Sequence, residues 1–350
     1  MVARFVAVTV ASKAFLSLAR VTARSFRAHQ PDVPFVLLLT DEVNGYFAPA
    51  DEPFSLLTLD DIGIERLEQF RFQHAQQELS YAATPHAIDH LLERGFDGVL
   101  FLKQETLVLD SLAPLLEGLH RHPLMLTPHL LTPPKRPDAL RRELDVLRAG
   151  VYNGGVVLAA NRPEARRFLR WWKERTFDEC ICRVEDGLHY EQRWLDFAPG
   201  LVPGTRIVRD PGVNVGHWNL RERDIRVRDG RVTANGLPCR VARFSGYEPE
   251  HPERVTRYRP EWKVEDDADV ARLFQRYHQM LLDEGYVETR AWPYAYGFFD
   301  NGAEVTEAHR RAYQRLGREA QRFGDPLVTR GAQSFWAWFE RSPRREAGPS

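Results

Sequence analysis

Residues 98–105 read Gly-Val-Leu-Phe-Leu-Lys-Gln-Glu, an apolar run that ends abruptly in three polar side chains. A short apolar run of this kind is typical of a strand buried on both faces, as in a mostly parallel sheet. The amphipathic segment 86–94 precedes it and predicts a helix packed on that sheet. Because open α/β sheets bind ligands at the carboxyl ends of their strands, Lys103, Gln104 and Glu105 are the first candidates for a functional site.

The surrounding sequence alternates apolar runs with amphipathic segments, which is the pattern of an α/β fold. The further strands expected are 5–10, 35–39, 54–59, 124–127 and 151–160, with a helix opening at Pro163. Thr84 followed by Pro85 predicts an N-cap with proline in the first turn of the helix over 86–94. We therefore expect an αβα sandwich with a mostly parallel central sheet.

The last third of the chain follows a different pattern. Asp229-Gly230 lies between alternating runs and indicates a β-hairpin. Helical periodicity then covers 264–284 and 307–322, with Thr306 as the N-cap of the second helix. The expected organisation is an α/β domain over 1–250, a helical C-terminal subdomain over 251–341 and a polar tail over 342–350.

Composition excludes several classes of function. Lys and Arg total 48 against 49 for Asp and Glu, so no net field favours nucleic acid or an anionic membrane surface. No apolar run approaches the roughly 20 residues of a membrane helix. Three cysteines are too few and odd in number for a disulfide framework, which favours a reducing compartment. We expect a cytoplasmic protein, peripheral to the inner membrane if it meets one.

Five segments, in this order along the first 250 residues or so, resemble bacterial relatives of the family 8 glycosyltransferases, which have the GT-A fold. They are the opening strand with Thr9-Val10-Ala11-Ser12, the helix and strand over 85–109, Tyr152-Asn153-Gly154-Gly155, Glu191-Gln192-Arg193-Trp194, and Phe244-Ser245-Gly246-Tyr247. The resemblance implies a hexosyltransferase-like enzyme that takes a sugar from a nucleotide-sugar donor. The sequence leaves the acceptor open among a glycan, a lipid-linked, a protein or a small-molecule acceptor, and it does not give the oligomeric state.

The expected metal site departs from the family pattern at two positions. The resemblance implies Asp-x-Asp where this chain has Lys103-Gln104-Glu105, and a metal-binding histidine where it has Arg243. Both changes replace a ligand by a positive charge, so we expect Lys103 and Arg243 to bind the donor diphosphate directly, with no metal cofactor. Two alternatives stay open: a manganese site built on Glu105 and Asp110, and a catalytically inactive relative that binds a nucleotide, a glycan or a protein partner.

The resemblance also implies roles for other side chains. Glu191 and Gln192 occupy the position of the family's Asp-Gln pair beside the anomeric carbon, so they join Lys103 and Arg243 as expected catalytic residues; the alternative for Glu191 is a solvated acidic helix face. The expected donor contacts are Thr9, Ala11, Ser12, Asp41, Tyr81, Gln104, Glu105, Asn153, Gly154, Gly155, Ser245, Gly246 and Tyr247. A loop rich in amides and aromatic rings suits a sugar, and its candidate contacts are Asn214, His217, Trp218 and Asn219.

Overall fold

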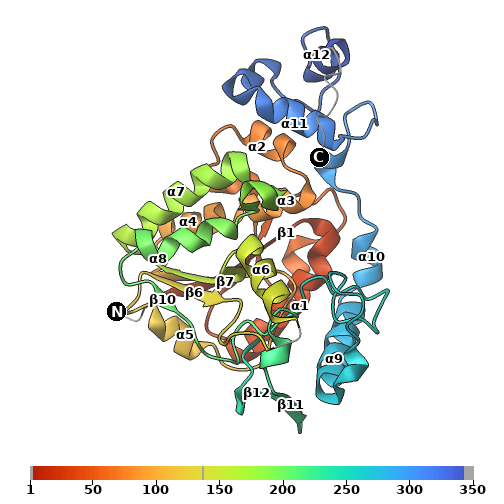
Figure 1. Ribbon diagram of the computed structural model, residues 1–350. Helices are drawn as coiled ribbons and strands as arrows, with labels where there is room; N and C mark the ends of the chain where they lie inside the picture. The colour runs from red at the N-terminus through yellow and green to blue at the C-terminus, as the bar shows by residue number, and fades with distance from the viewer. Residues whose placement is uncertain (1–2, 136–137, 343–350) are drawn as a thin grey trace.

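The computed structural model describes residues 3–135 and 138–342 (Figure 1). The expected polar tail therefore lies outside the described residues, apart from Ser342. No helix in this described part is both long and apolar enough to cross a membrane. All three cysteines are free.

A seven-stranded sheet forms the centre of the molecule, in the order β10-β6-β7-β4-β1-β2-β3. Its strands are β1 (Phe5–Ala11), β2 (Phe35–Leu39), β3 (Ser55–Thr58), β4 (Gly98–Leu102), β6 (Leu124–Pro128), β7 (Tyr152–Ala160) and β10 (Arg206–Ile207). Only β7 runs antiparallel to its neighbours, β4 and β6. The predicted mostly parallel sheet is thus confirmed, with β4 at its centre.

Helices cover both faces of the sheet, as the alternation along β1 shows. Val6, Val8 and Val10 share one core with α4 (Thr84–Glu93) and α7 (Pro163–Glu179). Ala7 and Ala11 point to the opposite core, which is shared with α1 (Leu16–His29) and α5 (Ala113–Gly118). Figure 1 shows these two helix layers on either side of the strands. The three-layer αβα architecture is confirmed.

The expected cap of α4 is wrong. Helices α2 (Leu67–Gln73) and α3 (Gln76–Ala82) precede it, and Ala83 occupies its N-cap. Thr84 already belongs to α4, and its hydroxyl donates to the Ser80 carbonyl at 3.3 Å instead of capping the helix. The cause is that the chain arrives at Thr84 already helical, so no free first turn exists there for a side chain to cap.

Short strands beside the main sheet bring distant segments together. β5 (Thr106–Val108) pairs antiparallel with β14 (Val241–Arg243), so Arg243 lies opposite Thr106. The remaining strands are β8 (Cys182–Arg183), β9 (Leu188–His189), β11 (Ile225–Arg228), β12 (Arg231–Ala234) and β13 (Leu237–Pro238). The predicted hairpin is confirmed between β11 and β12, where Asp229 and Gly230 adopt φ of 50° and 77°.

The helices after residue 250 pack in two separate places. α9 (Ala268–Asp283) and α10 (Tyr286–Arg290) share a core with Val21 of α1, whereas α11 (Glu307–Arg315) and α12 (Phe335–Arg341) pack around Phe72 of α2. The two groups lie far apart in Figure 1. Thr306 caps α11 as predicted, but that helix ends at Arg315 because Gly317 has a φ of 53°. The domain boundary at residue 250 stays a prediction.

Candidate functional site

A cavity of about 520 Å³ opens beyond the end of β4 and at the start of β7, which runs antiparallel to β4. Ten of the residues singled out from the sequence line it: Tyr81, Lys103, Glu105, Asn153, Glu191, Gln192, His217, Trp218, Arg243 and Ser245. These residues come from segments as far apart as 81 and 245 in the chain. The fold therefore assembles most of the proposed chemical groups at one place.

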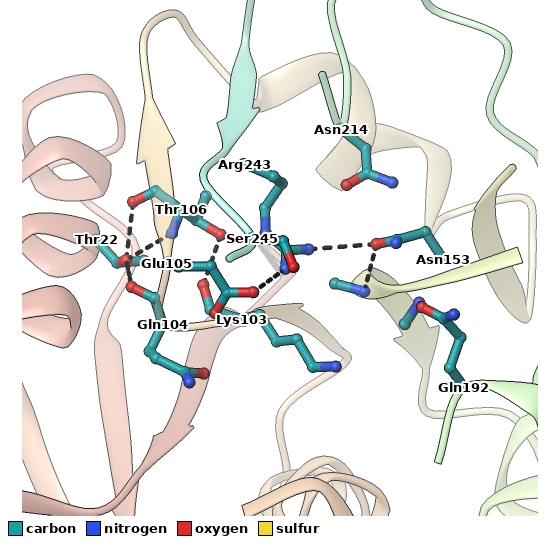
Figure 2. Close-up of polar contacts among 12 residues, drawn as sticks. Thr22, Lys103, Gln104, Glu105, Thr106, Asn153, Gln192, Asn214, Arg243 and Ser245 are labelled. Carbon is teal, nitrogen blue, oxygen red and sulfur yellow. Dashed lines mark hydrogen bonds and ion pairs between the residues drawn. The ribbon is translucent and has the colours of Figure 1, made fainter. Parts of the chain in front are cut away.

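Arg243 lies between two partners at the centre of this cavity. Its guanidinium forms an ion pair with the carboxylate of Glu105 and donates to Asn153 Oδ1 at 3.3 Å (Figure 2). Arg243 is only 4% exposed. Burial acts to raise the pKa of Glu105, but the charges of Arg243 and Lys103 outweigh it and lower that pKa. Glu105 is therefore ionised at neutral pH.

Two glycines of β7 make room for these side chains. A Cβ atom on Gly155 would lie 1.1 Å from Nη1 of Arg243, and one on Gly154 would lie 2.8 Å from Oε1 of Glu191. The space above both glycines is thus filled by Arg243 and Glu191. Any larger residue at position 155 would have to displace the guanidinium.

Lys103 forms the second ion pair of the site. Its Nζ lies 2.6 Å from Oε1 of Glu191 and 3.6 Å from the centroid of the Tyr81 ring. Glu191 is fully buried, and within the described residues neither of its oxygens receives a well-directed hydrogen bond. The alternative of a solvated acidic face therefore does not hold for Glu191. A buried carboxylate with spare accepting capacity can bind a hydroxyl of a ligand.

Gln192 has both ends of its amide bonded to the backbone. Its Oε1 accepts from the Gly154 amide at 2.8 Å, and its Nε2 donates to the Ala149 carbonyl at 2.9 Å. Gln192 thereby fixes β7 against the end of α6 (Ala139–Ala149). Its amide is already satisfied without a ligand.

His129 is a member of the site that the sequence analysis missed. Its Nε2 lies 3.0 Å from Asn153 Nδ2, and its Nδ1 lies 3.3 Å from the Val151 carbonyl. Burial lowers the pKa of His129 to about 4, so the imidazole is neutral. Nδ1 then donates to Val151 and Nε2 accepts from Asn153, which turns Asn153 Oδ1 towards Arg243. Its place directly after β6 was the available signal, because that strand ends at the same edge of the sheet.

The amide-rich loop divides into two kinds of residue. Asn214 donates to Thr127 Oγ1 at 2.9 Å, and Asn219 donates to the Asn214 carbonyl at 3.1 Å, so both fully buried amides hold the loop in place. His217 and Trp218 line the cavity. Burial lowers the pKa of His217 to about 3, which leaves its ring neutral.

The expected contacts at the end of β1 lie away from the cavity. Thr9, Ala11, Ser12 and Asp41 do not line it, nor do Gln104, Gly154, Gly155, Gly246 and Tyr247. Asp41 is 3% exposed and accepts from Lys13 Nζ at 2.8 Å and from the Ala295 amide at 3.0 Å. Burial raises its pKa despite the bond from Lys13. The chain around Ala295 thus covers the edge of the sheet where a nucleoside was expected.

The acidic residues considered as metal ligands form ion pairs with arginine side chains of the protein. Among the residues described, no three His, Cys, Asp or Glu side chains lie together as a metal ion would require. Asp110 Oδ1 lies 3.3 Å from Arg240 Nη1, and Glu105 pairs with Arg243. The two proposed manganese ligands are therefore each engaged by a different arginine.

Comparison with known proteins gives partial matches. No family model matches the chain. It is 33% identical over 114 residues to the uncharacterized protein YfnF of Bacillus subtilis (strain 168), a match covering 32% of this chain and 38% of YfnF. Over 134 residues it is 26% identical to YfnD of the same organism, covering 37% of this chain and 42% of YfnD. The matched regions thus span well under half of these relatives.

Three solved structures are similar in fold at low sequence identity. The galactosyltransferase LgtC in complex with donor and acceptor sugar analogs has a TM-score of 0.49 and 19% identity, with 79% of this chain and 95% of that chain covered. GlyE of Streptococcus pneumoniae TIGR4 has a TM-score of 0.45 and 14% identity, with 85% of this chain and 67% of that chain covered. Mouse xyloside xylosyltransferase 1 has a TM-score of 0.39 and 13% sequence identity, with 61% of this chain and 89% of that chain covered. All three are glycosyltransferases. Similarity at this level says nothing of what the present chain binds.

The geometry of the site allows a specific chemistry. Two buried cations, Lys103 and Arg243, each contact a buried carboxylate, and a neutral histidine orients an amide beside them. Arg243 keeps one donor without a partner in the described structure, its Nε. The site therefore offers fixed donors for an anionic group and a carboxylate oxygen for a hydroxyl, within a few ångströms of one another.

Proposed function

We propose that this chain is a glycosyltransferase that transfers a hexose from a nucleotide-sugar donor to an acceptor. The observation that carries the proposal is the convergence of Lys103, Glu105, Asn153, Glu191 and Arg243 on one cavity. Their segments are those that resemble the family 8 enzymes. Buried charges placed without apparent need for stability are characteristic of functional sites.

The donor diphosphate is proposed to bind to Lys103 and Arg243 without a metal ion. A departing nucleoside diphosphate gains negative charge, and preorganised donors stabilise that charge. Lys103 has two N–H groups beyond the one that faces Glu191, whereas the buried Nε of Arg243 reaches a phosphate only when the side chain shifts. Each charge-assisted contact contributes about 1.5–3 kcal/mol. Glu105 then positions the guanidinium instead of binding a metal.

Glu191 is proposed to act on the sugar. Its buried negative charge would stabilise an oxocarbenium-like centre, and its Oε2 would accept from a hydroxyl group of the acceptor or of the donor sugar. Lys103 pairs with Glu191 at 2.6 Å and so holds the carboxylate in place. On this proposal Lys103 contacts both the leaving diphosphate and Glu191, the carboxylate beside the reacting carbon.

A donor-hydrolysis assay in the presence and absence of EDTA tests this function. We expect turnover to be unchanged by the chelator, and Lys103→Ala to lower turnover at least tenfold while the protein stays folded by circular dichroism. Turnover that strictly requires added manganese would refute the metal-free mechanism.

One observation favours a second candidate, a catalytically inactive relative that binds a ligand in the same cavity. Asp41, an expected nucleoside contact, already bonds with Ala295 and Lys13. On this alternative no nucleotide sugar is hydrolysed, and Lys103→Ala leaves binding of a partner nearly intact. The same assay therefore separates the two candidates.

A further inference from the structure

The outer half of the cavity carries more positive than negative charge. Four guanidinium groups line it, those of Arg141, Arg142, Arg257 and Arg259, against one carboxylate, that of Asp145. We call these five residues the arginine rim. Arg141 and Arg257 are exposed, so the rim faces incoming ligands.

The inner half of the same cavity is balanced by comparison. Lys103 pairs with Glu191 and Arg243 with Glu105, one carboxylate for each cation. The three histidines of the cavity, at positions 129, 189 and 217, add no charge near neutral pH because burial lowers their pKa values to about 4, 4 and 3. The excess positive charge of the cavity therefore belongs to the arginine rim.

Arg142 is the least compensated member of the rim. Its side chain extends from α6 and is only 6% exposed. Its sole hydrogen bond within the described structure runs from Nη2 to the Trp218 carbonyl at 3.1 Å, and no described carboxylate lies within ion-pair distance of it. A buried guanidinium with unused donors is costly unless an anion binds it.

The other arginines of the rim differ in how far they are neutralised. Arg259 pairs with Asp145 at 2.7 Å, which accounts for the one carboxylate of the rim. Among the described residues, Arg257 has one distant ion-pair contact, with Glu248 at 3.9 Å, and a 3.5 Å hydrogen bond to the Tyr258 hydroxyl, whereas Arg141 forms no ion pair. Two exposed guanidinium groups and one buried one thus remain available to a ligand.

We propose that the arginine rim binds an oxyanion, a phosphate or carboxylate, that the acceptor carries. The inference rests on the proposed function, in which the inner cations take the donor diphosphate. The planar fork of arginine matches both oxyanions through paired hydrogen bonds. The rings of Trp218, Tyr258 and Trp262 also line the cavity, and they supply the apolar surface on which the sugar of an anionic acceptor stacks.

Calorimetric titration of the full chain tests this proposal with defined probes. Affinity for the arginine rim is measured with glucose, glucose 6-phosphate, glucuronate and inorganic phosphate. Affinity for the inner cations, Lys103 and Arg243, is measured with a set of nucleoside diphosphates. We expect glucose 6-phosphate and glucuronate to bind at least ~tenfold more tightly than glucose, the effect of one charge-assisted contact. Arg142→Gln should remove this difference and leave nucleoside diphosphate affinity within about twofold of the wild type.

Two further variants make the test independent of folding. Arg141→Gln changes an exposed side chain, so it should weaken the anionic probes without altering the melting temperature. Arg170→Gln is the matched control, because Arg170 is exposed on α7, forms no ion pair with a described residue and does not line the cavity; it should change nothing.

Each other outcome has a defined meaning. Equal binding of glucose and glucose 6-phosphate overturns the proposal, because no oxyanion is then recognised. An equal loss of nucleoside diphosphate affinity in Arg142→Gln also overturns it, since the rim then holds the donor's phosphates. If the wild type binds no nucleoside diphosphate but still binds glucose 6-phosphate through Arg142, the proposed function fails and the oxyanion site stands.

Discussion

Arg243 depends on residues that touch it from three directions. Glu105 balances its charge, Asn153 accepts one of its hydrogen bonds, and Gly155 leaves the space that the guanidinium occupies. Asn153 and Gly155 lie on β7, and Glu105 directly precedes β5. A small change at any of them therefore reaches the proposed phosphate-binding group.

Gly155→Ala tests how tightly this space is defined. The new Cβ would lie 1.1 Å from Nη1 of Arg243, so the guanidinium must leave Glu105. We expect a loss of stability of about 3 kcal/mol, the lower end of what breaking a buried ion pair costs, and at least a hundredfold loss of turnover. Urea denaturation and the hydrolysis assay measure the two effects.

Gly200→Ala is the matched control for this variant. A Cβ at Gly200 would have no heavy atom within 4 Å, and its φ is not positive, so turnover should stay at the wild-type value and stability should not fall. Wild-type stability in Gly155→Ala would mean that Arg243 does not occupy this position.

His129 makes the stability of the protein depend on pH. Its pKa is about 4 in the folded chain against an ordinary value of 6.5, so the unfolded chain binds a proton more readily. Stability from this group is present above pH 6.5 and is lost as the pH falls towards 4, by on the order of 3 kcal/mol in full. We expect His129→Gln to unfold with a shallower pH dependence than the wild type over this window. Parallel slopes in urea titrations at pH 7, 6 and 5 would contradict the neutral, buried histidine.

At the scale of single residues, the sequence identified the charged and polar side chains of the cavity but not the residues with which they pair. Lys103, Arg243, Asn153 and Glu191, which the motifs singled out, line one cavity, and their roles stay predictions. Their pairing was not predictable, because β5 and β14 join segments more than 130 residues apart and no local pattern specifies that register. His129 was missed although it directly follows β6, because its role depends on Asn153 on the neighbouring strand β7.

Among the helices and strands, those with many buried apolar side chains were predicted from the sequence. β2 and β4 have the bounds expected for them because all five residues of each are apolar or glycine and buried. Helix α6 was not predicted, and Arg142 is its only buried residue. Leu140, Leu144 and Leu147 recur at helical spacing along α6, but all three are exposed, so this amphipathic pattern marks no part of the buried core. Its position over the cavity follows from Arg142 and Trp218, which are distant in sequence.

Helix α6 should therefore be the less stable of two otherwise comparable helices. α7 buries six side chains, among them Phe168 and Trp172, whereas α6 buries only Arg142. Local opening is easier where fewer contacts are lost, so we expect amide hydrogens of α6 to exchange at least tenfold faster than those of α7. Glucose 6-phosphate should slow exchange in α6 and leave α7 unchanged. Equal protection of both helices without ligand would contradict this assignment.

At the scale of the whole molecule, the C-terminal segment connects the edge of the sheet near Asp41 with the outer helices. Between α10 and α11 the chain passes Asp41, where the Ala295 amide donates to its carboxylate, and the side chain of Trp292 stacks on Phe47 with ring centroids 6.1 Å apart. Sequence periodicity predicted helices on either side of this segment but not its crossing over Asp41, because the segment is irregular and Asp41 and Phe47 are remote from it in the chain.

A thermal-shift screen of nucleotide sugars in EDTA tests the binding site on the whole protein. A ligand that binds only the folded chain at a hundred times its dissociation constant stabilises it by about 2.7 kcal/mol, a rise of a few degrees in melting temperature. We expect one donor class to produce this shift equally with EDTA and with manganese, because Lys103 and Arg243 supply the charge. Lys103→Ala should abolish the shift, and Lys135→Ala, at an exposed lysine that does not line the cavity, should retain it. A shift seen only with manganese would show that a metal ion, and not this pair of cations, holds the diphosphate.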